Sequence, residues 1–328
     1  MTIKQIISLR HLLSLVAVLM TVSLSAQTTM KEVADAYNEG VQYITSNQEL
    51  AIKAFEKTIA LADAVDEPEA VQLKNNAIGQ IPKLYFDWAR ALAGKSDLKG
   101  AVTQLENCLK ASEKYNSTQF VRNATTTLAA IHLTLGNNAL TAKDYATAIT
   151  NYDAAISYDN QSIKSYLGKL MVYQAQNQLD EMVEIAEAAI AAGARPNDAA
   201  VLVDINRVLS TSFFNAAQKS MQDKNYKMTE EHLTNSVKFG NDNSVVYYQL
   251  GLARMNMDKW SDAIDAFMEA ADTEEGGDAE KAKIYFNMAK CYESLNNATK
   301  ACESYKKALF GEFAAAAKYQ IETVLKCG

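Results

Sequence analysis

The chain has 328 residues, of which 48% are hydrophobic and 22% charged, and its formal net charge is −7. This composition is that of a globular protein and excludes a disordered or collagen-like chain. There are only 13 glycines and 3 prolines, whereas sandwiches, barrels and doubly wound folds use both residues in their many tight turns. The composition therefore predicts a mostly helical protein. Its acidic charge, without a basic stripe, also disfavours nucleic acid and anionic membrane surfaces as partners.

The first 26 residues have the layout of a cleavable secretory signal peptide. Lys4 and Arg10 precede an apolar stretch at 12–24, and small residues follow it. The stretch has 13 residues, fewer than the roughly 20 that a transmembrane helix needs. We expect an exported product, residues 27–328, that is periplasmic, associated with the cell envelope or secreted, and that has no stable membrane span after processing. Cleavage after Ser25 and cleavage after Ala26 both stay open.

A pattern of aromatic and small residues recurs along the rest of the chain, in three clear copies. Spacings of 3 and 4 keep the residues of each copy on one face of a helix. The small residues fall where two helices would approach most closely, and a large aromatic fills the space one turn further on. The copies are Tyr247, Leu250, Gly251, Ala263, Phe267 and Ala270; Tyr285, Met288, Ala289, Tyr292, Ala301, Tyr305 and Ala308; and His132, Leu135, Gly136, Ala148, Tyr152 and Ala155.

This pattern resembles the tetratricopeptide repeat (TPR), and weaker copies extend the resemblance over residues 30–310. The resemblance implies an all-α fold, a right-handed superhelical solenoid of antiparallel helix pairs. Together with the predicted signal peptide, it indicates an exported TPR protein of bacterial type. We expect about seven repeats and a C-terminal capping helix at 312–327, because end repeats need a cover for their apolar face. The repeats are predicted near 33–62, 69–111, 119–159, 163–193, 198–239, 244–272 and 279–310.

The steps between repeats are uneven, which predicts two unusually long helices at 68–93 and 198–221. Pro68 would lie in the first turn of the former, and Pro82 is a possible kink. Three turns between paired helices share a polar residue followed by an aromatic that covers the turn. These dipeptides are Asp144-Tyr145, Asn225-Tyr226 and Lys259-Trp260.

Candidate chemistry is sparse in the predicted mature chain. His132 and His232 lie in different repeats: His132 is interpreted as a packing residue and His232 as lying on a helix face next to Leu233, so no metal cluster is implied. The acidic segment 272–278 lacks the ligand spacing of a calcium loop and is interpreted as a solvated turn. Gly94-Lys95-Ser96 lacks the upstream glycine of a phosphate loop. We predict no catalytic residue, no metal and no cofactor.

Four cysteines in an exported chain raise the question of disulfide pairing. Cys108 occupies a small position on a predicted buried helix face and is expected to be a free thiol. Cys291, Cys302 and Cys327 all fall in the last repeat and the cap. A disulfide between two of these three, and three reduced thiols, both stay open.

The resemblance also implies a function. In the family, the first helix of each pair lines a concave groove that binds peptides or partner proteins. We therefore predict a non-enzymatic scaffold or adaptor, and as the alternative an accessory binding protein for a small ligand or a transport or secretion component. The apolar groove residues would otherwise only fill a tight superhelix. Leu133 stands where the family's clamp for a carboxylate would begin with a lysine, so a chaperone tail is not the expected ligand. The partner's identity and the oligomeric state stay open. The predicted groove residues are Lys83, Phe86, Arg90, Leu133, Asn137, Phe214, Asn215, Gln218, Tyr248, Gln249, Leu252, Met255, Lys283, Asn287 and Lys290.

Overall fold

The computed structural model of the protein describes residues 28–193, 195 and 198–327, and all regular secondary structure in these ranges is helical. The predicted all-α fold is therefore confirmed, while the predicted signal peptide lies outside the described residues. Of the helices described, none is long and apolar enough to cross a membrane. The chain divides into two units, residues 1–131 and 132–328.

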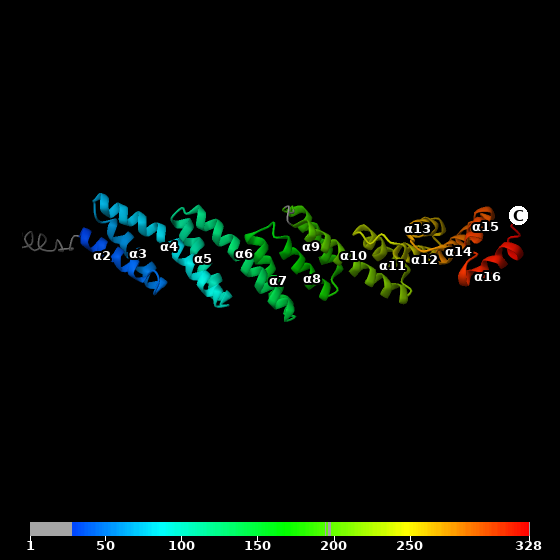
Figure 1. Ribbon diagram of the computed structural model, residues 1–328, viewed down its shortest axis with the longest axis horizontal. Coiled ribbons are helices and arrows are strands. Elements are labelled where there is room, and N and C mark those ends of the chain that lie inside the picture. The colour runs from blue at the N-terminus through cyan, green and yellow to red at the C-terminus, as the bar shows by residue number, and fades with distance from the viewer. Residues whose placement is uncertain (1–27, 194, 196–197, 328) are drawn as a thin grey trace, which may run out of the picture. The chain divides into compact units, whose positions relative to one another are not determined.

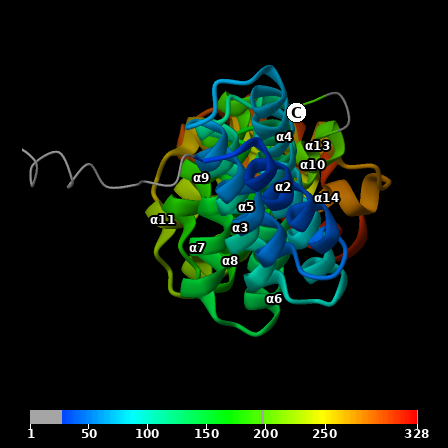
Figure 2. The same cartoon turned by 90° about the vertical axis from the view of Figure 1, so that its left-hand side faces the viewer.

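The N-terminal unit is built from consecutive antiparallel helices. α2, α3 and α4 lie side by side at its beginning (Figure 2), and α5 packs on α4. Phe55, Ile81 and Leu84 form the centre of the core between them. Pro68 begins α4 as predicted, and Pro82 lies inside the same helix. The elements are α2 (Met30–Tyr43), α3 (Gln48–Ala62), α4 (Pro68–Gly94), α5 (Leu98–Lys114) and the N-terminal part of α6 (Thr118–Thr141).

The C-terminal unit begins within α6 and continues as further helix pairs in chain order, coloured green to red in Figure 1. Each first helix packs along the second helix of its own pair, and each second helix packs on the next pair. The long helix predicted at 198–221 is confirmed as α10. The elements are α7 (Tyr145–Tyr158), α8 (Ile163–Ala175), α9 (Leu179–Ala192), α10 (Ala199–Gln222), α11 (Tyr226–Lys238), α12 (Ser244–Met255), α13 (Trp260–Thr273), α14 (Asp278–Ser294) and α15 (Ala298–Lys307).

The small and large positions of the repeat meet as the spacing predicts. A Cβ added at Gly251 would lie 2.5 Å from Cε1 of Phe267, and one at Gly136 would lie 2.7 Å from Cε1 of Tyr152. Both aromatic side chains are fully buried. The pairs can therefore approach this closely only because these two positions carry no side chain.

Seven turns between consecutive helices use a left-handed residue that is not glycine. Each of these residues lies two positions before the first residue of the next helix, with φ between 55° and 65°. Two of the predicted turn residues, Asp144 and Asn225, follow directly and cap the next helix by accepting a hydrogen bond from a backbone N–H. The low glycine content therefore does not reflect a lack of left-handed turns. The left-handed residues are Ser96, Asn116, Lys143, Asn177, Lys224, Asp258 and Asn296.

The C-terminal segment covers the last helix pair, but it is not the single helix that the sequence predicted. A 3₁₀-helix (η2, Gly311–Phe313), a short α-helix (α16, Ala314–Tyr319) and a π-helix (η3, Gln320–Val324) follow one another. Ala317 packs with Tyr305 in a buried cluster, as a cap requires. The prediction of one continuous helix is wrong because the backbone changes its hydrogen-bonding pattern twice.

The structure settles which of the three C-terminal cysteines form a disulfide. Cys302 of α15 and Cys327 form a disulfide with 5.8 Å between their Cα atoms. Cys108 and Cys291 are free and buried, so the prediction for Cys108 is confirmed. Burial raises the pKa of both thiols to about 11, and they therefore remain protonated at neutral pH.

Candidate functional site

Five predicted groove residues come together at one pocket in the C-terminal unit. Gln218 of α10, Tyr248, Gln249 and Leu252 of α12, and Lys283 of α14 line a pocket of about 490 Å³. These three helices are the first members of consecutive pairs, and all the described lining residues belong to them. We call this the groove pocket; its lining is completed by Met221, Gln222, Ser244 and Val245.

Those last four lining residues were missed by the sequence reasoning, although a signal for them existed. Met221 and Gln222 follow Gln218 by three and four positions. Ser244 and Val245 precede Tyr248 by four and three positions. Residues at these separations lie on the same helix face, so extending each predicted position by one turn would have included all four.

Tyr248 is held in place from α14 and from the core. Its hydroxyl oxygen accepts a hydrogen bond from Nδ2 of Asn287 at 3.0 Å, and Nζ of Lys283 lies 5.2 Å from the centre of its ring. On its other side, the ring packs against Phe267 with 5.8 Å between ring centres. Burial raises the pKa of Tyr248, so the phenol is neutral. The result is a rigid aromatic wall with a polar tip.

Gln249 carries an unused hydrogen-bond acceptor at this pocket. Its Oε1 atom is buried and has no hydrogen-bond partner among the described residues. A buried polar atom without a partner costs about 1–3 kcal/mol. A donor on a ligand in the groove pocket would relieve that cost, provided that the amide turns toward it.

Charge at the groove pocket is positive although the chain as a whole is acidic. Lys283 is the charged residue among its described lining. Negative charge lies next to the pocket, where Glu274 accepts hydrogen bonds from Ser244 Oγ at 2.8 Å and from the backbone N–H of Gly276 at 3.0 Å. These two hydrogen bonds lower the pKa of Glu274, so it stays ionised and is already occupied within the protein.

Further cavities continue along the same first helices. Phe214 lines one of about 660 Å³, which shares Ser244 and Val245 with the groove pocket. Lys290 and Met255 line another of about 670 Å³ toward the C-terminus. Apart from Asn215 and Asn287, the predicted groove residues of α10, α12 and α14 therefore border a row of cavities rather than one isolated cavity.

The remaining predicted residues have other surroundings. Asn137 accepts a hydrogen bond from the hydroxyl of Tyr152 at 2.8 Å, so its oxygen already has a partner. In the N-terminal unit, Phe86 packs against Phe120 with 5.9 Å between ring centres, and Arg90 is exposed. Leu133 packs in the core of the C-terminal unit, and Lys83 pairs with Asp87 at 3.0 Å. Asn215 lines a different pocket, described below.

Metal-ligand chemistry receives no support from the residues that the structure describes. They contain no group of three or more histidine, cysteine or acidic side chains placed to hold an ion. His132, predicted to be a packing residue, stacks on Tyr158 with 5.8 Å between ring centres, so that prediction is confirmed. The ring of His232 lies 6.0 Å from that of Phe213.

One helix pair matches a family model. Residues 282–309, which cover most of α14 and all of α15, match a model described as tetratricopeptide repeat. The resemblance seen in the sequence is thus confirmed for this stretch. No curated protein matches the chain.

Several solved structures are similar in fold. They include YrrB, described as a TPR protein with an unusual peptide-binding site (21% identity, TM-score 0.31, covering 58% of this chain and 91% of its own). MamA is 16% identical (TM-score 0.33, 60% and 96%), and TTC0263, a thermophilic TPR protein in Thermus thermophilus, is 15% identical (TM-score 0.27, 60% and 99%). At these identities and TM-scores, no ligand is transferred from them to this chain.

Proposed function

We propose that the chain is an exported, non-enzymatic scaffold or adaptor of bacterial type that binds an extended peptide segment of a partner protein in the groove pocket. The observation that carries the proposal is the composition of that pocket. The described lining of one cavity of about 490 Å³ combines an anchored aromatic, a lysine and a glutamine whose buried carbonyl oxygen has no hydrogen-bond partner among the described residues.

Each part of the lining suits a different part of a peptide. Tyr248, Leu252 and Met221 supply apolar surface for one side chain of the ligand. Gln218 and Gln249 carry amides, which can both donate to and accept from a peptide backbone. Lys283 favours an acidic group nearby. The proposed ligand is therefore an extended segment with an apolar side chain close to an acidic one.

The binding test uses peptides selected by display against residues 27–328. Dissociation constants of the best peptides are measured by calorimetry for the unchanged protein and for Phe214→Ala with Tyr248→Ala. Loss of a central aromatic typically weakens an interface by 2 kcal/mol or more, about 30-fold. Tyr319→Ala is the matched control, because that side chain lies on the cap and is 58% exposed.

A second variant guards against misfolding of the double mutant. Val245 lines the groove pocket and is 53% exposed, so Val245→Asp should fold normally while adding negative charge to the site. We expect it to weaken an acidic peptide at least tenfold. Unchanged affinity in both this variant and the double mutant would contradict the proposal.

Export is tested separately by following the N-terminus. The full chain is expressed in a Gram-negative host, and the protein released from the periplasm is analysed by intact mass. We expect loss of residues 1–25 or 1–26. A cytoplasmic protein that retains its first residues would contradict export without bearing on the groove pocket.

A further inference from the structure

A second pocket arises where the repeat spacing is irregular. The opening aromatics Tyr166 and Phe213 are 47 residues apart, instead of about 34 for a regular repeat. The extra sequence lengthens α10, so that its two halves pack on different partners. Ile205 and Leu209 pack in the core with α8 and α9, whereas Ala217 packs with Leu233 of α11.

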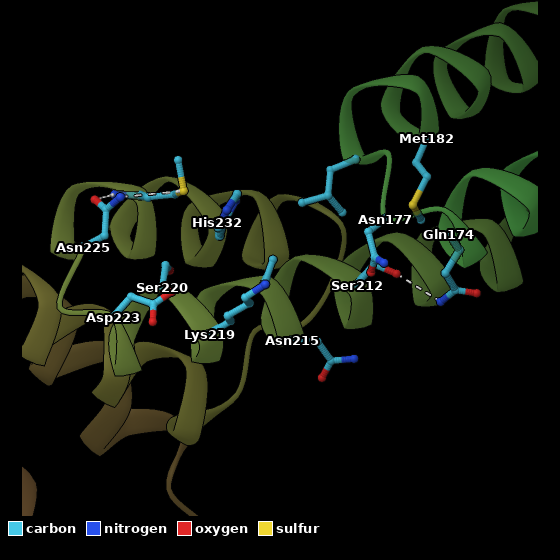
Figure 3. Close-up of a pocket in the computed structure, with 13 residues that line it drawn as sticks. Gln174, Asn177, Met182, Ser212, Asn215, Lys219, Ser220, Asp223, Asn225 and His232 are labelled. Carbon is cyan, nitrogen blue, oxygen red and sulfur yellow. Dashed lines mark hydrogen bonds between the residues drawn. The ribbon is translucent and has the colours of Figure 1, made fainter.

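This division of α10 leaves a cavity of about 530 Å³ between the α8–α9 pair and the α10–α11 pair. We call it the inter-repeat pocket. Figure 3 shows Gln174 and Met182 on the α8–α9 side, and Lys219, Asp223 and His232 on the α10–α11 side. None of its described lining residues belongs to the groove pocket.

Two opposite charges line the pocket from one helix. Lys219 lies in the last turn of α10, and Asp223, four residues later, is the C-cap residue that ends the helix, so their Cα atoms are separated by a rise of about 6 Å along the helix axis. Within the described residues neither makes a salt bridge: all the ion pairs found involve other side chains. An ion pair between the two would also be weak, because a lysine that precedes an acidic residue by four positions pairs less favourably than one that follows it. Both charges are therefore available to a ligand.

The other walls are polar amides and apolar side chains. Gln174 donates from Nε2 to Ser212 Oγ at 3.0 Å, and Asn215 supplies a second amide. Leu179 and Met228 add apolar surface, whereas Met182 is fully buried. These groups match a ligand with hydrogen-bonding amides and apolar side chains.

His232 adds a neutral polar group to the same pocket. Burial lowers the pKa of its imidazole, so it carries no charge near pH 7. Its Nδ1 atom is buried and has no hydrogen-bond partner in the described part of the chain. The charge of the pocket is therefore set by Lys219 and Asp223 alone.

We propose that the inter-repeat pocket binds a dipeptide with free termini, whose carboxylate pairs with Lys219 and whose ammonium group pairs with Asp223. Lys219 and Asp223 lie about one helical turn apart, so a short ligand with a carboxylate at one end and an ammonium group at the other can pair with both. The central amide of the dipeptide lies against Gln174 and Asn215, and its apolar side chains lie against Leu179 and Met228.

The test uses L-alanyl-L-leucine as the probe and residues 27–328 as the protein, with binding followed by calorimetry. N-acetyl-alanyl-leucine lacks the ammonium group, and alanyl-leucinamide lacks the carboxylate. We expect both derivatives to bind about tenfold more weakly than the probe or worse, since each loses one charged hydrogen bond. L-leucine has no amide to place against Gln174 and Asn215, so it should also bind more weakly than the probe.

Variants identify the site. Lys219→Met and Asp223→Asn should each weaken the probe about tenfold, and both side chains are exposed, so the fold should not change. Lys227→Met on α11 and Asp265→Asn on α13 are matched controls at exposed positions outside the pocket, and should bind the probe normally.

Three results would overturn the proposal: no detectable binding of the probe, equal binding of the blocked derivatives, or equal loss in the matched controls. Tyr248→Ala should leave probe binding unchanged, because Tyr248 does not line this pocket. A negative result with the dipeptide therefore leaves the proposed binding of a peptide segment in the groove pocket unaffected. In the same way, a negative result at the groove pocket leaves the dipeptide proposal unaffected.

Discussion

Gly251→Ala is the substitution that tests the close approach of paired helices most sharply. A Cβ at this position would lie 2.5, 2.6 and 2.9 Å from Cε1, Cδ1 and Cζ of Phe267, where carbon atoms in contact are normally about 3.5–4.0 Å apart. Phe267 is fully buried and packs against Tyr248, so its ring cannot withdraw without displacing the groove pocket.

The magnitude follows from two opposing contributions. Overpacking of a core costs about 1–3 kcal/mol, and an overlap of this size belongs at the upper end. Alanine in place of glycine inside a helix contributes about 1 kcal/mol in the other direction. We therefore expect the free energy of unfolding to fall by about 2 kcal/mol, which corresponds to a decrease in Tm of about 4–8 °C for a unit of this size.

The matched control is Gly79→Ala, at an exposed position within α4 where nothing lies within 4 Å of an added Cβ. It should gain about 0.5–1 kcal/mol. The chain has two tryptophans, Trp88 in the N-terminal unit and Trp260 in the C-terminal unit. Urea unfolding followed by Trp260 fluorescence in a Trp88→Phe background reports on Gly251, and the converse background reports on Gly79.

A double-mutant cycle separates overlap with the ring from any other effect. In a Phe267→Leu background the obstructing ring atoms are gone, so Gly251→Ala should cost at least about 1 kcal/mol less than in the unchanged chain. If Gly251→Ala stabilises the protein as Gly79→Ala does, or costs the same with and without the ring, the reasoning is refuted.

Three further predictions concern the turns, the disulfide and the buried histidine. Lys143→Gly and Lys224→Gly, at φ of 61° and 55°, should each raise the free energy of unfolding by about 0.5–1 kcal/mol, because a left-handed conformation strains a residue with a side chain; urea unfolding measures it, and a loss of stability would contradict it. Replacing both Cys302 and Cys327 by serine opens a loop of 25 residues and should cost about 3 kcal/mol, measured by unfolding without reductant against the unchanged protein; equal stability would show that the bridge contributes nothing. Burial lowers the pKa of His232 from its ordinary 6.5, so below about that pH the unfolded chain takes up a proton that the folded chain does not, and stability falls as the pH drops from 7 to 5; His232→Gln should flatten that decrease, and an unchanged pH slope would argue against it.

The repeat pattern was predictable because small residues occupy the positions where two helices approach most closely and large aromatic residues fill the space beside them. Gly136 and Gly251 mark such positions, and Tyr152 and Phe267 fill the neighbouring space. Gly168 was missed, although a Cβ there would lie 2.4 Å from Cε1 of Tyr152. That contact joins two successive pairs, and spacing within one repeat carries no information about it.

The turns show where composition alone is misleading. Scarce glycine predicted helices, which is right, but it does not show which residues take the left-handed conformation in the turns between them. Lysine and asparagine occupy such positions instead, as at Lys143 and Asn177. Asparagine tolerates this conformation through local hydrogen bonding, whereas lysine has no such compensation, so only the coordinates reveal it.

The site was predictable in part. The helical register identified Tyr248, Gln249 and Lys283, because the exposed face of a first helix follows directly from its buried face. The inter-repeat pocket was not predictable, and Asn215, assigned to the groove, lines it instead. Its existence depends on which halves of α10 pack on which neighbours, and the sequence shows only that the helix is long.

Photocrosslinking of a selected peptide tests the central claim most directly, because it reports where the ligand lies. The photoreactive residue p-benzoylphenylalanine is placed either at Val245 in the groove pocket or at Ile190 on α9, side chains that are 53% and 57% exposed. We predict efficient crosslinking from position 245, suppressed by excess unlabelled peptide, and background crosslinking from position 190. Equal yields from both positions, or a higher yield from position 190, would contradict binding in the groove pocket.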